Sequence, residues 1–317
     1  MKRLLTFVLI MGLGPGLLCA QSFSGAAKGT TAADFLRLGV GGRAMGMAGA
    51  YSAVADEATA LYWNPAALTR IDKRSATFMH ASYIESSYFD YGAYAQNFGE
   101  YGAFGIGMQY LNAGAMTKTD ANFNSEGDFT PYDMAVSVGY GRKLTGLGLP
   151  AALEGFALGG TAKFIRSHVL QTAQTGAFDF GVLSPAYFRG KLNLAFTATN
   201  MGGTLKREAA TENLPMTFKA GSAFKLTDRW LASFDLGLPR NDAAFFAVGT
   251  EYTLPLKDGW SAMGRAGYDS QTLSDVSGMT GLAVGAGIGA KSLSFDYAFV
   301  PYGGLGISNR FSLTVKF

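Results

Sequence analysis

The sequence predicts an all-β fold, a transmembrane antiparallel β-barrel of about fourteen strands whose N-terminal segment lies in the lumen as a hatch. Three observations predict it. Apolar and polar residues alternate up to the last position, itself an aromatic, through Phe311, Leu313, Val315 and Phe317. About fourteen runs of the same period follow one another from about residue 75. The chain also combines 43 glycines, 15 tyrosines and 24 phenylalanines with only 15% charged residues, which is typical of strands that face lipid.

The first 20 residues predict a secretory signal peptide. Two cations stand near the start, a short apolar run covers residues 4–10, and Ala20 ends the expected cleavage site. The apolar run is too short to span a membrane. A lipoprotein signal at Cys19 is the alternative, although Leu18 stands where that signal requires a small residue.

Composition excludes several classes of protein. Cys19 is the only cysteine, so cleavage after Ala20 leaves a chain without disulfides. Removal of Lys2 and Arg3 leaves 24 of the 26 cations against 23 anions, and a balance of +1 gives no support to a nucleic-acid partner. No stretch of eighteen apolar residues follows the signal, which argues against helical membrane spans.

The alternating runs define the expected strands and their faces. Period two places Leu293, Phe295 and Tyr297 on one side of a sheet and Ser294 and Asp296 on the other. Strands are expected at about residues 75–84, 88–98, 102–113, 131–143, 154–168, 173–185, 190–201, 214–226, 229–238, 242–254, 259–268, 280–289, 291–300 and 308–317. We expect lipid-facing side chains at Phe246, Val248, Leu293, Phe295, Leu313 and Val315, and lumen-facing ones at Glu251, Asp296, Ser312 and Thr314.

The connections between these runs alternate in length. Tight turns such as residues 99–101 alternate with longer stretches such as 114–130 and 202–213. Short periplasmic turns and longer outer loops produce this alternation in outer-membrane barrels. Residues 144–153 are long for a turn and residues 85–87 short for an outer loop, so the expected number of strands is uncertain by two.

The segment before the barrel has a different pattern. Residues 21–72 do not alternate; they are rich in small and apolar residues, and residues 73–317 form the expected barrel. Residues 53–63 are expected to form about three helical turns, which end at Asn64 because the residue before Pro65 avoids the helical region. Since about fourteen strands enclose a lumen that must hold water or a plug, this segment is expected to be the hatch.

Two blocks resemble a known family. Residues 34–50 read DFLRLGVGGRAMGMAGA and residues 53–68 read AVADEATALYWNPAAL. They resemble the N-terminal signature of the PorV/PorQ family and, more distantly, the FadL-like long-chain fatty-acid transporter superfamily, which shares an acidic-Ala-x₅-Asn-Pro-Ala element. A second match covers residues 198–203, ending in Asn200-Met201-Gly202-Gly203, and is followed by Leu214-Pro215. The resemblance implies a fourteen-stranded barrel with a lumenal hatch.

The candidate functional residues lie mainly in the hatch. Asp56 and Glu57 are expected to hold the hatch by capping or ion pairing, with a carboxylate pair for acid/base chemistry as the alternative. Asn64, Pro65 and Ala66 are expected to form a turn that holds the hatch against the wall, with a gating role as the alternative. We expect the aromatic end, Phe317, to be the signal that the barrel-assembly machinery recognises.

No metal site or cofactor is expected. His80 and His168 are the only histidines, and neither has a second histidine or a cysteine nearby. We expect both to be barrel-girdle or lumen residues. An enzymatic barrel with Ser167 and His168 at its outer rim is the alternative.

The sequence therefore predicts a non-enzymatic barrel in the outer membrane of a Gram-negative-type bacterium. The expected function is passage of hydrophobic small molecules, as implied by the FadL-like resemblance. The alternative is an accessory barrel of type IX secretion that binds exported cargo proteins through its outer loops, as implied by the PorV resemblance. The expected partners are outer-membrane lipid, the assembly machinery, a hydrophobic ligand and secretion-system components, without nucleic acid.

Overall fold

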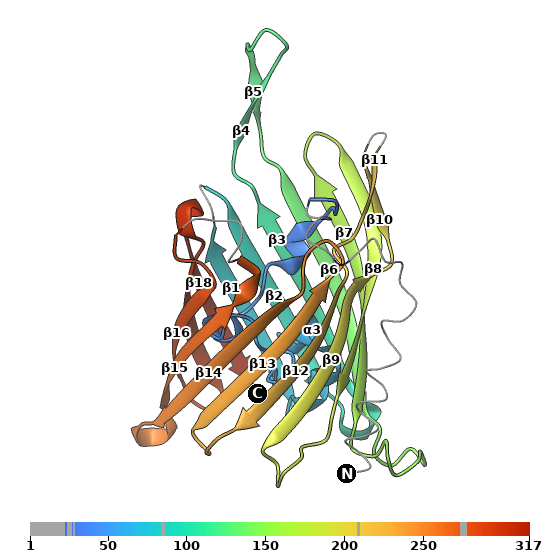
Figure 1. Ribbon diagram of the computed structural model, residues 1–317, viewed down its shortest axis with the longest axis vertical. Coiled ribbons are helices and arrows are strands. Elements are labelled where there is room, and N and C mark those ends of the chain that lie inside the picture. Colours follow the sequence, from blue (N-terminus) through green and yellow to red (C-terminus); the bar gives the residue numbers. More distant parts are fainter. Residues whose placement is uncertain (1–22, 24–26, 28, 84–85, 208–209, 273–277) are drawn as a thin grey trace.

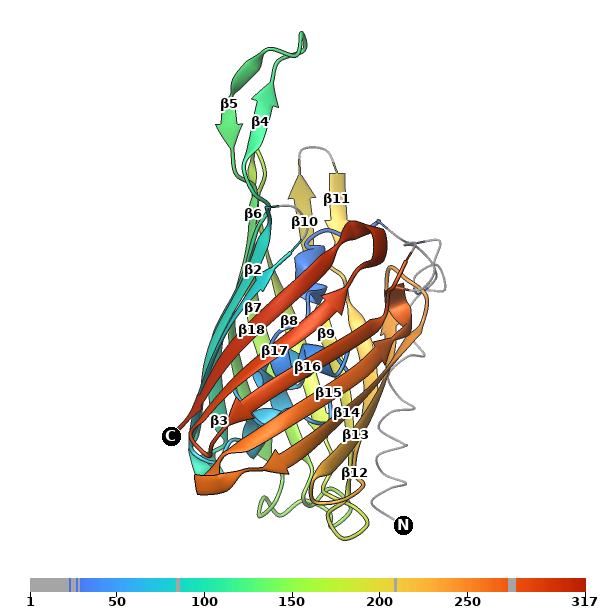
Figure 2. The ribbon, with the colours of Figure 1, turned by 90° about the vertical axis from the view of Figure 1, so that its left-hand side faces the viewer.

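The main body of the computed structural model is a closed antiparallel β-barrel that surrounds an N-terminal segment (Figures 1 and 2). The structure describes residues 23, 27, 29–83, 86–207, 210–272 and 278–317. The predicted signal peptide, with Cys19, lies outside these residues. No helix in the described part of the chain is long and apolar enough to cross a membrane.

Fourteen strands form the barrel, and each pairs with the next one along the chain until β1 closes the ring against β18. This confirms the predicted number, and every expected run overlaps one of the observed strands, with ends that differ by at most three residues. Their bounds are β1 (Arg74–Ser82), β2 (Tyr88–Asn97), β3 (Ala103–Asn112), β6 (Tyr132–Lys143), β7 (Ala157–His168), β8 (Thr172–Leu183), β9 (Leu192–Met201), β12 (Thr217–Lys225), β13 (Trp230–Pro239), β14 (Phe245–Pro255), β15 (Ser261–Asp269), β16 (Leu282–Gly289), β17 (Leu293–Pro301) and β18 (Ile307–Lys316).

The two ends of the barrel differ. The turn end carries the C-terminus and mostly short connections, including η4 (Gly99–Tyr101) and η5 (Lys257–Gly259). The loop end carries η6 (Ser270–Thr272), η7 (Gly303–Leu305) and two hairpins that extend beyond the barrel rim (Figure 2). In outer-membrane barrels the short turns face the periplasm and the longer loops face outward.

The two hairpins correct the sequence-based expectation, which treated residues 114–130 and 202–213 as loops. Here β4 (Met116–Thr119) pairs with β5 (Ser125–Phe129), and β10 (Thr204–Arg207) pairs with β11 (Ala210–Asn213). Strands of four or five residues are too short for a period of two to be distinguished from chance. Their pairing depends on the turn that folds each loop back on itself.

Side chains alternate between lipid and lumen as predicted. Phe246 and Phe295 on the outer face are 41% and 46% exposed, whereas Glu251 and Asp296 on the inner face are only 6% and 2% exposed. The other predicted faces are also confirmed, with Leu313 exposed and Ser312 and Thr314 buried. The barrel therefore presents an apolar exterior and a polar interior, which is the arrangement of a membrane barrel.

Both ends carry outward-facing aromatic residues. At the loop end, neighbouring rings on β1, β2, β3, β6 and β7 form a continuous row with centroid distances of 5.3–6.2 Å: His80, Tyr88, Tyr110, Tyr132 and His168. At the turn end, exposed aromatics include Phe104, Tyr140, Trp230, Trp260 and Phe317. Two such girdles mark the membrane–water interfaces of a barrel.

The hatch contains four short helical pieces: η2 (Asp34–Arg37), α2 (Gly42–Gly46), α3 (Ala60–Trp63) and η3 (Pro65–Arg70). The prediction of a three-turn helix over residues 53–63 is wrong, because only the last four of these residues, which form α3, are helical. Backbone amides just before it, those of Tyr51 and Ser52, bind the carboxylate of Asp235 on β13. Within the expected helix, the Ala58 amide donates to the Ser75 hydroxyl of β1 (3.1 Å), and the Ala53 carbonyl accepts from Arg70 (2.7 Å). A helix over residues 53–63 would use both backbone groups internally, so these tertiary contacts override the local helix preference.

Candidate functional site

The hatch enters the lumen from the loop end. The Ala32 amide donates to the Asn213 carbonyl beside the β10–β11 hairpin (3.0 Å), and Arg37 donates to Asn241 next to β13 (3.2 Å). The chain then crosses the lumen toward the turn end, where η3 contacts β6, β7 and β8. The hatch therefore extends through most of the barrel, and its core residues are buried.

Glycines in the wall form the surface that receives the Asn64-Pro65-Ala66 turn. A Cβ atom on Gly159 would lie 2.3 Å from the Pro65 carbonyl carbon, and one on Gly181 would lie 2.2 Å from the Asn64 Oδ1. Both distances are shorter than any side chain tolerates, so the hatch backbone can approach the wall only because these positions lack a Cβ atom. The strand glycines thus have a packing role.

Asn64 holds this turn in place through both ends of its side-chain amide. Its Oδ1 accepts from the Ala66 amide (3.1 Å) and caps η3, while its Nδ2 donates to the carbonyls of Val182 on β8 (3.2 Å) and Ser52 in the hatch (3.0 Å). All of these groups are buried, so each bond replaces one that water would otherwise make. Asn64 thus lies at a contact between the hatch and the wall.

The other side of the hatch is held by polar groups of β1 and β18. The Gly42 amide donates to the Ser312 Oγ (2.9 Å), and the Gly41 amide lies 3.0 Å from the Met79 sulfur. The buried guanidinium of Arg310 donates to the Gly39 carbonyl and to the Tyr302 hydroxyl. Backbone groups that the short helices leave without partners are thereby satisfied by the wall.

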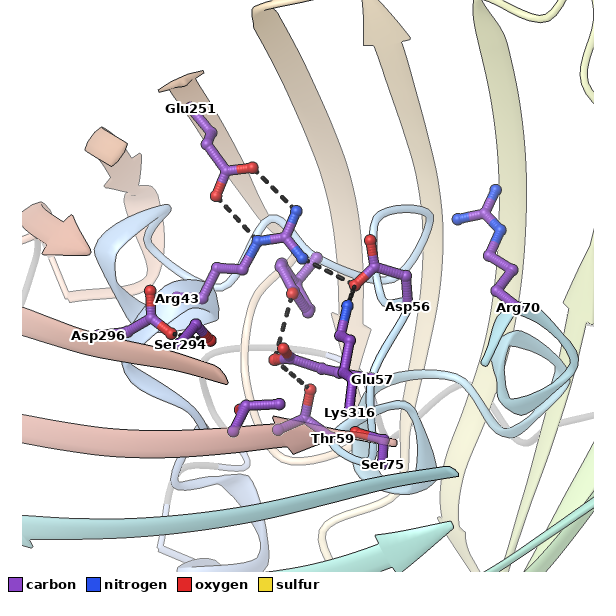
Figure 3. Close-up of polar contacts among 12 residues, drawn as sticks. Arg43, Asp56, Glu57, Thr59, Arg70, Ser75, Glu251, Ser294, Asp296 and Lys316 are labelled. Atoms are coloured by element: carbon purple, nitrogen blue, oxygen red, sulfur yellow. Dashed lines mark hydrogen bonds and ion pairs between the residues drawn. The ribbon is translucent and has the colours of Figure 1, made fainter. Parts of the chain in front are cut away.

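An ion network joins the hatch to β14, β15, β17 and β18. Figure 3 shows its contacts around Arg43 and Asp56. Arg43 of α2 makes a two-bond pair with Glu251 (2.8 and 2.8 Å) and a third bond with Asp56 (2.8 Å). Arg265 bonds Glu251 (2.6 Å) and pairs with Asp296 (2.8 Å), and Lys316 lies 3.4 Å from Asp56. Three cations thus balance three carboxylates, which buried charges require.

The two hatch carboxylates lie in different surroundings. Burial raises the pKa of Asp56, but the charges of Arg43 and Lys316 outweigh this, so its pKa lies below the ordinary value. Burial raises the pKa of Glu57, and Arg43 compensates only in part. Glu57 accepts from Thr59 (3.1 Å) and Tyr51 (3.5 Å), both within the hatch. Asp56 therefore connects hatch to wall, whereas Glu57 orders the hatch internally.

A small cavity of about 60 Å³ lies between the hatch and the wall toward the loop end. Its wall residues stand near the loop ends of their strands, as Phe245 and Thr217 begin β14 and β12. The hatch contributes apolar and aromatic side chains, and the wall contributes hydroxyls, amides and two lysines. The lining residues are Leu36, Arg37, Tyr62, Trp63, Lys163, Thr197, Thr199, Asn200, Thr217, Lys219, Phe245 and Gln271.

Larger, open cavities lie on the other side of the hatch, at the turn end. Two of about 490 and 480 Å³ meet at Arg43, Asp56 and Glu251 of the ion network. A third of about 400 Å³ adjoins Asp56, Arg70 and Lys316. The ion network thus lies between the interior of the hatch and the open cavities at the turn end.

The second matched sequence block forms a bulge beside the small cavity. The register between β8 and β9 shifts near Phe178, and Asn200 adopts a left-handed conformation (φ 57°), which asparagine tolerates better than most residues. The Asn200 amide donates to Asp179 (2.7 Å), and its side chain donates to the Pro215 carbonyl (3.4 Å). This explains why Asn200 and Leu214-Pro215 occur together.

The remaining candidate residues lie at the outer face and at the end of the chain. His80 pairs with Asp90 (2.6 Å) and His168 lies 3.0 Å from Thr172, both within the loop-end girdle. Ser167 is buried, and it points to the opposite face from its neighbour His168, so the two do not form a common site. Phe317 lies outside the barrel at the turn end, 54% exposed.

The sequence-based reasoning missed the wall partners of the hatch. Arg43 was not a candidate, and Glu251 and Asp296 were expected only as inward-facing residues. Arg265 and Arg310 follow the same period of two and are also buried. A charge at an inward position of a strand implies a partner of opposite sign in the lumen. The inward charges of the strands were therefore the signal in the sequence that could have identified Arg43 as a partner.

The fold matches solved outer-membrane channels. A mutant of the TodX monoaromatic hydrocarbon channel is 12% identical, with 88% of this chain and 99% of that chain covered and a TM-score of 0.58. The Pseudomonas putida toluene transporter TodX is 10% identical (81% and 93% covered, TM-score 0.51), and a Pseudomonas aeruginosa FadL homologue is 12% identical (88% and 98%, TM-score 0.52).

Sequence comparisons reach less far. The profile of an uncharacterised protein family (UPF0164) matches residues 18–156, which is less than half of the chain. No curated protein sequence matches. At these low identities the likeness to solved structures concerns the fold alone. The chain therefore has the closed, fourteen-stranded antiparallel fold of the FadL-like outer-membrane channels.

Proposed function

We propose that this protein is a non-enzymatic outer-membrane channel of PorV/PorQ type that lets small, largely apolar molecules pass a lumenal hatch. The observation that carries the proposal is the position of the hatch, which has a partly aromatic cavity on its loop-end side and open polar cavities on its turn-end side. The solved structures of similar fold include channels titled for monoaromatic hydrocarbons and toluene, which supports the same class of cargo.

The location follows from the exterior of the barrel. An apolar belt between two aromatic girdles fits a lipid bilayer, and a signal peptide over residues 1–20 would direct the chain out of the cytoplasm. We therefore place the protein in the outer membrane of a Gram-negative-type bacterium. The partners we expect there are the assembly machinery during folding and the transported molecule afterwards.

Passage would require movement of the hatch. Leu36, Tyr62 and Trp63 belong to the hatch and line the loop-end cavity. A molecule bound there has to displace these side chains, or the ion network below them, before it reaches the turn end. The contacts that hold the hatch are hydrogen bonds, ion pairs and glycine contacts, so its release costs a few contacts and leaves the barrel ladders intact.

The test is transport into proteoliposomes that contain the purified protein. Deletion of residues 30–70 should leave a barrel that still migrates in a heat-modifiable way on gels, with raised permeability to toluene-sized and small polar solutes. If the deleted protein does not fold, the double variant R43Q/E251Q provides the same test without shortening the chain. Wild-type permeability of the folded deletion variant, or of a folded R43Q/E251Q barrel whose hatch amides exchange faster than in the wild type, would show that the hatch is not a plug and would refute the proposal.

A second function is favoured by the loop-end hairpins. The β4–β5 hairpin is held by a Lys118–Glu126 ion pair (2.6 Å) and presents Phe123, 88% exposed, at its tip. Such a projection suits contact with another protein, as expected of a type IX secretion accessory that binds exported cargo. Deletion of residues 116–129 should then abolish capture of secreted proteins in the native organism without changing solute permeability. Unchanged capture would exclude this role for the hairpin.

A further inference from the structure

The loop-end cavity is small, but its lining is unusual for a channel that carries neutral hydrocarbons. Three of the twelve lining residues are cations, Arg37, Lys163 and Lys219, and none is a carboxylate. A neutral apolar cargo gains nothing from buried positive charge, which costs free energy to keep away from water. Only a cation without a partner in the described part of the protein would be available to a ligand.

Two of the three cations already have partners. The ammonium of Lys163 lies 2.7 Å from Asp179 and 2.7 Å from the Asn200 Oδ1. Arg37 donates to the Asn241 side chain, and its charge interacts with that of Asp34 on the same helical turn. Neither Asp179 nor Asp34 lines the cavity.

Lys219 differs from both. Its ammonium lies over the rings of Trp63 (5.0 Å) and Phe245 (5.6 Å), and no carboxylate of the described residues lies within ion-pair distance. The nearest further acids are Asp235, whose carboxylate accepts from Ser52 and Tyr51, and Asp269, which accepts from the Gln271 amide. Neither acid lines the cavity. The ring faces stabilise the cation but leave its N–H donors available.

An independent observation points to the same place. Thr197 lies directly opposite Lys219 on the neighbouring strand β9, so both side chains face the cavity from adjacent positions. Thr197 is fully buried, and its hydroxyl has no hydrogen-bond partner. A buried hydroxyl without a partner costs free energy unless a ligand or water supplies an acceptor. An ammonium and a hydroxyl, both without an acceptor among the described residues, thus line the same cavity.

We infer that this cavity binds the carboxylate of a small amphipathic monoanion, with Lys219 and Thr197 donating to its oxygens and Leu36, Trp63 and Phe245 packing against its apolar part. One unbalanced lysine favours a single negative charge. The volume corresponds to roughly four water-sized spheres, which accommodates a carboxylate and a few carbons but excludes a long acyl chain. The inference rests on the proposed function and narrows its cargo to short-chain carboxylates.

The test measures binding of butyrate and of its neutral counterpart, 1-butanol, to the purified full-length mature barrel in detergent by calorimetry. The wild type should bind butyrate at least tenfold more tightly than 1-butanol. K219M removes the ammonium while keeping most of the length of the side chain, and should weaken butyrate binding by tenfold or more. T197V removes only the hydroxyl and should weaken it by about two- to tenfold. Neither variant should change the affinity for 1-butanol.

A matched control comes from the same strand. Lys225 ends β12 at the turn end and lines the 490 Å³ cavity there, so K225M should bind butyrate like the wild type. Equal binding of butyrate by K219M and wild type, equal loss in K225M, or equal affinity for butyrate and 1-butanol would each overturn the inference. If K219M does not fold, T197V decides the matter by the same criterion.

The same measurements separate this inference from the channel proposal. Hatch-dependent passage of toluene without butyrate binding would leave the channel in place and refute the carboxylate site. Butyrate binding that requires Lys219, without hatch-dependent passage of any solute, would keep the site and refute the channel.

Discussion

Replacement of Arg43 by methionine should release the hatch from the wall without unfolding the barrel. Arg43 is the only residue in the described part of the hatch that pairs with both Asp56 of the hatch and Glu251 of the wall. Methionine keeps much of the apolar stem and removes the guanidinium. The barrel ladders, which carry most of the stability, contain none of the bonds that are lost.

The magnitude follows from the partners that remain. Loss of one member of a buried ion pair costs about 3–5 kcal/mol when the other charge is left alone. Glu251 keeps Arg265 at 2.6 Å, and Asp56 is 39% exposed and keeps Lys316. Because both carboxylates keep a cation, we expect a smaller loss, about 2–3 kcal/mol, for the three charge-assisted bonds. This corresponds to roughly a 30- to 160-fold rise in the population of the released hatch.

Hydrogen exchange is the suitable assay, because it reports local opening separately from global unfolding. Amides of residues 42–63 should exchange about 30- to 160-fold faster in R43M than in the wild type, while the strands stay protected. R70M is the matched control. Arg70 also belongs to the hatch, but it donates only to the Ala53 carbonyl within the hatch (2.7 Å), so its loss should not separate hatch from wall.

Two results would refute this reasoning. Unchanged exchange over residues 42–63 in R43M would mean that the glycine contacts and Asn64 alone hold the hatch. Faster exchange throughout the strands would mean that the ion network supports the barrel itself. A double-mutant cycle with E251Q should give a coupling free energy of about 1–3 kcal/mol, since the two residues share two bonds.

Three further predictions follow from the same contacts. Gly159→Ala should destabilise hatch docking by about 1–3 kcal/mol in the exchange assay, because its Cβ would overlap Pro65, whereas Gly160→Ala, whose Cβ would have no neighbour closer than 3.5 Å, should not. Deletion of Phe317 should lower membrane levels of folded barrel on heat-modifiability gels, and normal levels would exclude a role in assembly. The pKa of Glu57 is raised above its ordinary value, so its contribution to hatch stability is complete below pH 4.5 and declines as the pH rises through the folded-state pKa. E57Q should remove that decline, and a decline that persists in E57Q would assign it to another group.

The barrel could be predicted in detail because its signal is local. A strand that faces lipid on one side and polar groups on the other must alternate at period two, and residues 242–254 or 291–300 show this without reference to any other part of the chain. The hatch could be located for the complementary reason, since a long segment without alternation must lie elsewhere. The short hairpins in the outer loops carry too few residues for the same signal.

Within the candidate site, the sequence determined which residues are inward and which belong to the hatch. It could not determine how they pair. Arg43 and Glu251 are separated by 208 positions, and Gly159 meets Pro65 only because η3 crosses the lumen to β7. The helix expected over residues 53–63 does not form, because the Ala58 amide and the Ala53 carbonyl bond the side chains of Ser75 and Arg70 instead of backbone groups within a helix. Local alternation is a property of a strand and its solvent, whereas ion pairing, backbone approach and the position of an unpaired lysine depend on the closed barrel that brings distant residues together.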